Sequence, residues 1–160
     1  MPIRHAVKED LDTLARIEAA SYPPEEGATR EQLEGRIAAF GERFWILEED
    51  GAVKGFVNGF VTPEENLTDE MYAAPAMHTP EAPWQMIFSV VTDVPYLRQG
   101  VATRIMERVV SDCRAEGKKG IVLTCKDRLI PFYSRFGFVD EGVSSSEHGG
   151  VVWHQMRLRF

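Results

Sequence analysis

The sequence has 160 residues, and we expect residues 1–160 to form one domain that buries a sizeable hydrophobic core. Hydrophobic residues make up 44% of the chain and charged residues 27%, as in an ordinary globular protein. The 25 acidic and 18 basic residues give a net charge of −7, which argues against a nucleic-acid or acidic-membrane partner, because such surfaces need clustered lysine and arginine.

The first residues include Arg4, Lys8 and Asp10 and lack the apolar core of a signal peptide. No apolar run has the length of a membrane-spanning helix. We therefore expect a cytoplasmic protein with no membrane partner. Cys113 and Cys125 make no disulfide framework, and no Cys/His cluster has metal-ligand spacing, so no metal site is expected.

The first forty residues predict one short strand and two helices. Residues 2–7 are partly β-branched and predict an edge strand, whereas apolar residues at helical spacing within 9–20 predict a helix. The prolines at 23–24 end that helix. A capping-box pattern then opens a second helix over 29–40, and Gly41 stands where a helix end favours a left-handed residue.

An antiparallel hairpin comes next. Residues 44–47 and 53–61 are strand-like runs, and the Asp-Gly dipeptide between them is a strong hairpin-turn signal. Residues 62–83 hold four prolines and little periodicity, apart from a short helix pattern at 67–72. Loops of this length are uncommon and are usually functional or mobile, so the segment predicts either a substrate-side lid or a disordered insertion.

The rest of the chain is organised around a strand, a basic glycine loop and a helix. Residues 84–92 are a dense apolar run and predict a central strand. Arg98 and Gly100 follow, before a helical pattern that ends at Gly117. The first turn of a helix leaves backbone N–H groups unpaired at the positive end of its dipole, so this unit predicts an anion-binding loop.

A second strand–helix unit and two late strands complete the chain. Residues 120–124 predict a buried strand and 127–136 a helix, and residues 138–143 and 151–158 predict the last two strands. The order of elements is mixed α/β, with an antiparallel front half and helical crossovers behind it.

Two motifs resemble the GNAT superfamily of acyl-coenzyme A-dependent N-acyltransferases. Residues 97–102, Leu-Arg-Gln-Gly-Val-Ala, are similar to its pyrophosphate loop, R/Q-x-x-G-x-G/A, and residues 131–138 to the helix before its late strand. This resemblance implies an α/β fold with a mixed sheet of about seven strands, flanked by about four helices. Leu97 departs from the motif, because the family has arginine or glutamine there.

Within the superfamily, the chain most resembles the arylalkylamine (serotonin) N-acetyltransferases. Residues 15–18, 67–70 and 123–127 carry this likeness. Met86 and Phe88 stand where the animal enzymes have a histidine pair used in proton transfer. The resemblance therefore implies transfer of acetyl from acetyl-CoA to an amine by direct attack, with the usual base missing.

The resemblance also implies the site residues. Tyr133 would be the general acid that protonates the departing thiolate. The amine would lie against Phe88 and the loop that carries Tyr22, Pro23, Glu25 and Glu26, where a ring and a carboxylate suit an arylalkyl ammonium. Acetyl-CoA would be bound by Val90, Val91, Thr92, Arg98, Gln99, Gly100, Val101, Ala102, Thr103 and Phe132.

No residue stands out as the base. His78, His148 and His154 all titrate in the useful range, and a water chain to Glu26, or an amine that arrives neutral, would also serve. The partner is expected to be a small-molecule amine, and the protein a monomer or a homodimer.

Other functions stay open. The acceptor of a GNAT enzyme here can also be a peptide, a polyamine or an antibiotic amine. A CoA-binding regulatory module that has lost catalysis is a second class, although Tyr133 and Gly100 argue against it. A plain nucleotide binder is disfavoured, because no Walker lysine follows Gly100 and no G-x-G-x-x-G motif is present.

Overall fold

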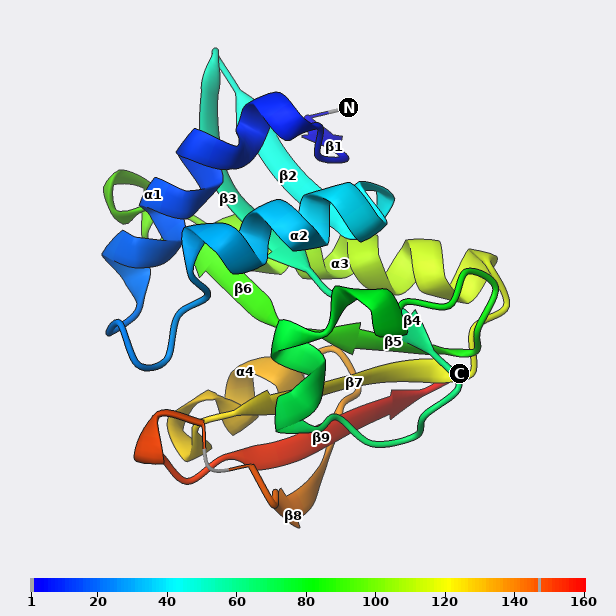
Figure 1. Ribbon diagram of the computed structural model, residues 1–160. Coiled ribbons are helices and arrows are strands. Elements are labelled where there is room, and N and C mark those ends of the chain that lie inside the picture. The colour runs from blue at the N-terminus through cyan, green and yellow to red at the C-terminus, as the bar shows by residue number, and fades with distance from the viewer. Residues whose placement is uncertain (1, 147) are drawn as a thin grey trace.

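The computed structural model describes residues 2–146 and 148–160, which form two sheets with helices around them (Figure 1). The helices are α1 (Leu11–Ser21), α2 (Arg30–Phe40), α3 (Val101–Ala115) and α4 (Ile130–Ser134). The strands are β1 (Ile3–Arg4), β2 (Phe44–Glu49), β3 (Ala52–Asn58), β4 (Val61–Thr62), β5 (Trp84–Ile87), β6 (Ser89–Thr92), β7 (Gly120–Cys125), β8 (Val139–Val143) and β9 (His154–Arg159).

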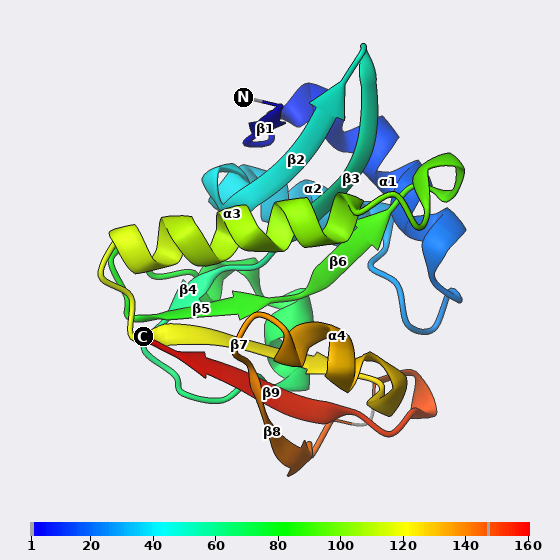
Figure 2. The ribbon, with the colours of Figure 1, turned by 180° about the vertical axis from the view of Figure 1, so that it is seen from behind.

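The expected mixed α/β class is confirmed, but the strands are divided between two sheets. A four-stranded sheet has the order β1-β2-β3-β6, and a five-stranded sheet has the order β4-β5-β7-β9-β8. The β5–β7 pair is parallel, and the other pairs in the described chain are antiparallel. Front and back views show α1 and α2 on one side of the first sheet and α3 on the other (Figures 1 and 2).

The hairpin expected around Asp50 and Gly51 is present between β2 and β3. Both residues have positive φ angles, 55° and 76°, as a type I′ turn requires. Gly41 was expected to be left-handed, and this expectation is wrong, because its φ is −52° and its ψ is −29°. A Cβ there would lie 2.8 Å from the Ala6 carbonyl oxygen, so glycine permits a close approach of two backbones instead.

The predicted central strand over 84–92 is broken at Phe88. The first part, β5, pairs with β7 as far as Ile87 opposite Leu123. The second part, β6, pairs with β3 from Ser89 opposite Asn58 onward. One stretch of chain therefore serves two sheets, which separate after residue 87 (Figure 2).

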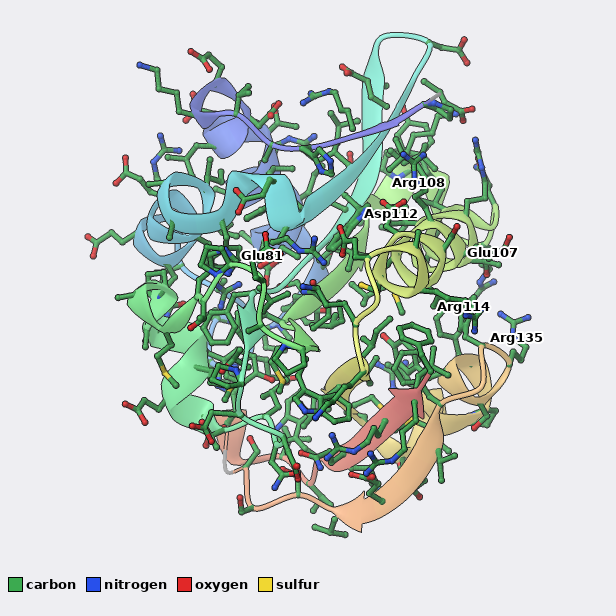
Figure 3. The ribbon with its side chains drawn as sticks, turned by 90° about the vertical axis from the view of Figure 1, so that its right-hand side faces the viewer. Glu81, Glu107, Arg108, Asp112, Arg114 and Arg135 are labelled. Atoms are coloured by element: carbon green, nitrogen blue, oxygen red, sulfur yellow. The ribbon has the colours of Figure 1, made fainter. Side chains whose placement is uncertain are left out.

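Helix α3 is amphipathic and covers the back of both sheets. Its buried face includes Ile105 and Val109, which have no exposed surface. Glu107 and Arg114 are exposed on its outer side (Figure 3), where the Arg114 guanidinium lies over the Phe160 ring at 5.0 Å from the ring centre. The helix thus presents apolar residues to the core that lies under β2, β3 and β7.

The segment 62–83 folds as two short 3-10 helices, Asp69–Ala73 and Pro75–Met77. Leu67 and Met71 are buried in the core between this segment and α2. The disordered-insertion alternative is therefore wrong, since the segment buries apolar side chains. No helix in the described part of the chain is long and apolar enough to cross a membrane.

Two further boundaries differ from the prediction. The helix expected over 127–136 is a 3-10 turn, Asp127–Leu129, followed by the short α4. The last strand begins at His154 rather than at 151, because residues before it turn back over the loop that follows α1. Both changes shape the cavity described next.

Candidate active site

A cavity of about 340 Å³ opens where β6 and β7 separate. Its floor comes from both strands, and its walls come from four segments that are far apart in sequence. Its lining residues are Glu18, Ser21, Tyr22, Pro23, Glu26, Tyr72, Ile87, Phe88, Ser89, Val90, Leu123, Thr124, Cys125, Lys126, Arg128, Leu129, Tyr133, His148 and Trp153. Six of the predicted site residues are among them: Tyr22, Pro23, Glu26, Phe88, Val90 and Tyr133.

Val90 offers a backbone group to this cavity. Its carbonyl accepts a hydrogen bond from the Tyr22 hydroxyl at 3.1 Å, so it points away from β3. Backbone groups alternate in direction along an antiparallel pair, and the N–H of the same residue therefore points the same way. The free side of β6 is suited to pairing with an extended ligand, as a sheet edge pairs with an added strand.

The loop before α3 has the conformation of an anion site. Gly100 is the residue before the helix, with a φ of +79°, and a Cβ on it would meet nothing within 4 Å. Arg98 also has a positive φ, 63°. The N–H groups of Val101, Ala102 and Thr103 form the first turn of α3, where a helix leaves its donors unpaired. These features fit a pyrophosphate group.

Tyr133 reaches the cavity from α4. It is 6% exposed, and its ring packs edge-on against Phe132 and Phe138. Burial raises the pKa of its phenol well above the usual range, so the hydroxyl stays protonated at neutral pH. Among the described residues, none accepts a hydrogen bond from that hydroxyl, which leaves it available as a donor.

Phe88 forms one wall of the cavity at the break between β5 and β6. Its ring lies 4.9 Å from that of Phe60 and 5.2 Å from that of Tyr72. The Arg36 guanidinium lies over it at 4.9 Å from the ring centre. This aromatic wall continues to His148, whose ring is stacked on Tyr72 at 5.0 Å.

Glu18 is a cavity residue that the sequence reading did not select. It lies on α1 and is 2% exposed. Its Oε2 atom accepts hydrogen bonds from the Ala28 N–H at 2.9 Å and the Ser89 hydroxyl at 3.2 Å. Burial raises the pKa of its carboxyl, although the Ala28 hydrogen bond and the Arg36 charge oppose the rise. The sequence did contain a signal for it: Glu18 is a charged residue on the same helix face as the apolar Leu14 and Ile17.

The carboxylate of Glu26 is already paired. Its Oε1 atom lies 2.7 Å from the Lys126 Nζ atom, so the ion pair joins the loop after α1 to the end of β7. Glu25, which was expected on the acceptor side, is exposed and does not line the cavity. The acceptor loop therefore contributes one carboxylate, and a lysine already neutralises it.

The three histidines that were considered as bases lie in different places. His148 lines the cavity, and its Nε2 atom lies 2.6 Å from the Glu26 carbonyl oxygen. His78 contacts Glu42 at 3.2 Å, and burial lowers its pKa. His154 contacts Asp140 at 3.2 Å on the outer strands. Only His148 of these three belongs to the cavity.

Tyr72 and Trp153 complete the acceptor end of the cavity. The Tyr72 hydroxyl and the Thr124 hydroxyl are 3.0 Å apart, and the Trp153 indole donates to the His148 carbonyl at 2.7 Å. Three loops meet here, and no local pattern in the sequence pointed to their meeting. Only the tertiary structure brings these residues together.

Some predicted cofactor residues lie outside the cavity lining. The Val91 side chain is buried in the core, and Phe132 packs on Tyr133 and Phe136. The Thr92 carbonyl accepts a hydrogen bond from the Ser21 hydroxyl at 3.4 Å. Within residues 2–146 and 148–160, no group of three or more His, Cys, Asp or Glu side chains is placed to hold a metal ion.

Comparison with known proteins gives matches over most of the chain. A family model described as the acetyltransferase (GNAT) family matches residues 11–138. The chain is 24% identical over 110 residues to a serotonin N-acetyltransferase from Mesocricetus auratus, and the match covers 68% of this chain and 52% of that protein. The chain thus spans about half the length of this curated relative.

Two solved structures share the fold over nearly their whole length. The loading GNATL domain of CurA from Lyngbya majuscula has a TM-score of 0.84 at 16% identity, and the alignment covers 98% of this chain and 96% of that one. The GphF GNAT-like decarboxylase, in complex with isobutyryl-CoA, also has a TM-score of 0.84, at 19% identity and 99% coverage of both chains. At these identities, the likeness shows the fold alone.

Proposed function

Since the chain belongs to the acetyltransferase (GNAT) family, we propose that it transfers acetyl from acetyl-CoA to a primary amine, with both substrates bound together. One observation carries this proposal. The cavity between β6 and β7 brings together the side of β6 that pairs with no other strand in the described chain, a protonated phenol and aromatic walls. The backbone edge can hold the arm of an acyl thioester, the phenol can protonate the departing thiolate, and the aromatic walls can bind the amine that attacks directly.

The residues present fit an acyl-CoA. The first turn of α3 and Gly100 would hold the pyrophosphate, with Arg98 supplying charge and Gln99 completing the loop. Val90 would pair with the pantetheine arm through its backbone. Bound there, acetyl-CoA supplies an acetyl group activated as a thioester.

Tyr133 is proposed as the general acid. Its phenol is protonated, faces the cavity and has no acceptor among the described residues, so it can give its proton to the departing thiolate. Cys125 also lines the cavity, but burial raises the pKa of its thiol to about 11, which argues against a role as nucleophile.

The acceptor is proposed to be an arylalkylamine. Tyr22, Tyr72, Phe88 and Trp153 line the cavity with aromatic rings, which can stack on a ring or bind a cation. The serotonin N-acetyltransferase match points to the same class. A cytoplasmic location, and a monomer or homodimer as the active form, remain predictions.

The test is release of free thiol from acetyl-CoA against a panel of amines. Phenethylamine, tryptamine and serotonin represent the proposed class, and spermidine, aminoglycosides and short peptides represent the other acceptors. Turnover confined to the first group supports the proposal. If acetyl-CoA binds and no amine reacts, either the acceptor is an amine outside this panel or the protein is a CoA-binding module without transferase activity.

A decarboxylase is the second candidate. The Tyr72 and Thr124 hydroxyls are 3.0 Å apart, and the Tyr72 ring is stacked on His148; hydroxyl donors of this kind can stabilise the enolate that remains when a carboxylated acyl thioester loses CO₂. One structural neighbour is a GNAT-like decarboxylase. Malonyl-CoA and methylmalonyl-CoA, followed by mass spectrometry for CO₂ loss without an amine, distinguish this activity from acetyl transfer.

A further inference from the structure

One carboxylate oxygen in the cavity has no partner. Glu18 lines the cavity and is almost fully buried, and its Oε2 atom is satisfied by Ala28 and Ser89. Its Oε1 atom has no hydrogen-bond partner among the described residues. A buried polar atom in this state costs about 1–3 kcal/mol, and more when it is charged. A ligand that brings N–H donors to this atom would remove that cost.

We propose that Glu18 Oε1 binds the ammonium group of the acceptor and takes its proton, and that the acceptor is a primary arylalkylamine with a single positive charge. This inference rests on the proposed acetyl transfer, and it supplies the base that the sequence did not reveal.

Two other groups in the cavity are less suited to this role. The Glu26 carboxylate is held by Lys126 at 2.7 Å, so an ammonium would have to displace that lysine. The His148 ring is held by the Glu26 carbonyl and by stacking on Tyr72. Glu18 and Glu26 each have one buried oxygen without a hydrogen-bond partner among the described residues, but the Glu26 oxygen is ion-paired with Lys126, whereas Glu18 forms no ion pair in the described chain.

The groups that face Glu18 come from every element packed around it. The charges of Arg36 on α2 and of His148, on the turn before β9, lower the pKa of Glu18, and Ser89 on β6 donates a hydrogen bond to its carboxylate. Burial is the main cause of the raised pKa of Tyr22, and the charge of Glu18 raises it further. Burial outweighs the favourable charges and raises the pKa of Glu18, which makes its carboxylate a better proton acceptor at neutral pH.

The limit to one positive charge follows from the rest of the lining. The only other carboxylate in the described lining, Glu26, is already paired with Lys126, and Arg128 lines the same cavity, so a second ammonium group on the acceptor would find no free carboxylate and would meet like charge. The aromatic rings of Tyr72, Phe88 and Trp153 instead suit an uncharged ring. Phenethylamine therefore fits this cavity better than spermidine.

In the proposed step, the acceptor loses a proton before its nitrogen attacks. One proton of the ammonium moves to Glu18 Oε1, and the neutral amine nitrogen attacks the thioester carbonyl carbon of acetyl-CoA. A C–N bond forms and the C–S bond breaks, while Tyr133 protonates the sulfur. The new amide nitrogen returns a proton to Tyr133, and Glu18 releases its proton to solvent when the product leaves.

The test is Glu18→Gln, because the amide oxygen can still accept from Ala28 and Ser89. General-base catalysis contributes at least about 100-fold, so kcat/KM for phenethylamine should fall by about that factor. For an aryl hydrazide, whose nitrogen is uncharged at neutral pH, kcat/KM should change only a few-fold. Acetyl-CoA binding should not change. Glu34→Gln, an exposed glutamate on α2, is the matched control.

Two results with Glu18→Gln would overturn the proposal. One is an equal loss of kcat/KM for phenethylamine and for the hydrazide while acetyl-CoA binding stays intact, because a base would matter only for the charged amine, and an equal loss would therefore mean that Glu18 has a structural role. The other is wild-type-like turnover in the variant, which removes Glu18 as the base while acetyl transfer itself stands. If the variant does not fold, Glu18→Asp keeps the charge and should keep measurable activity with a pH profile shifted from wild type; an unshifted profile overturns the proposal.

Direct binding separates the inference from the proposed function. Calorimetry with phenethylammonium in the presence of CoA should show binding that Glu18→Gln weakens at least tenfold. If the wild type binds the amine in this way but releases no thiol, the ammonium site stands and the transferase proposal fails. If it neither binds nor reacts, both are overturned.

Discussion

Gly100→Ala should weaken CoA binding and lower stability, and Gly117→Ala should lower stability alone. The two glycines lie at opposite ends of α3, with φ angles of +79° and +75°, and neither would place a Cβ within 4 Å of another atom. The left-handed conformation costs other residues about 1–2 kcal/mol. At about 2–4 °C per kcal/mol for a chain of this size, each variant should melt about 2–8 °C lower.

The cofactor separates the two variants. A methyl group at Gly100 would enter the open space at the start of α3, where the pyrophosphate is proposed to lie. Loss of one charge-assisted hydrogen bond, worth about 1.5–3 kcal/mol, raises the Kd for CoA about 10- to 100-fold. Calorimetric titration with CoA and thermal melting measure both effects. An unchanged Kd in Gly100→Ala, or an equal loss in both variants, would refute the assignment of the loop.

Three further outcomes are expected. Tyr133→Phe should lower kcat by about 100-fold or more while the Kd for acetyl-CoA stays unchanged; steady-state kinetics measure this, and an unaltered kcat removes Tyr133 as the acid. Glu18→Gln should melt at a higher temperature than wild type at pH 8 but not at about pH 4. The pKa of the buried Glu18 carboxyl is raised, so its ionisation destabilises the folded wild type, and this cost is absent while the carboxyl is protonated at low pH. The same difference in melting temperature at both pH values would contradict a raised pKa. His148→Ala loses the stack on Tyr72 and the Glu26 contact, so KM for the amine should rise several-fold with CoA affinity unaltered, and a change in CoA affinity alone would contradict this.

Local chemistry made part of the fold predictable. The Asp50-Gly51 turn follows from backbone preferences that these two residues express on their own. The break at Phe88 does not follow from such preferences. An unbroken apolar run is equally compatible with one strand or with two strands in different sheets, and only pairing with β3 and β7 decides between them.

The same distinction holds for the cavity. Tyr133 and Tyr22 were predicted through motif positions, and both line it. Glu18 interrupts an apolar helix face, which is a visible signal, but its meaning depended on Ser89 and Ala28 arriving from elsewhere. His148 was one of three equal candidates, because its distance from the cavity depends on how the late loop folds back.

The separation of the two sheets at Phe88 also bears on how the protein opens and exchanges its amide hydrogens. Around the cavity, β6 and β7 belong to different sheets and are not paired with each other. A ligand that hydrogen-bonds to the free side of β6 and also contacts β7 would add a link between the two sheets on the cavity side, where their strands are not paired. Bound CoA should then slow amide exchange in both sheets, including strands such as β9 that line no part of the gap.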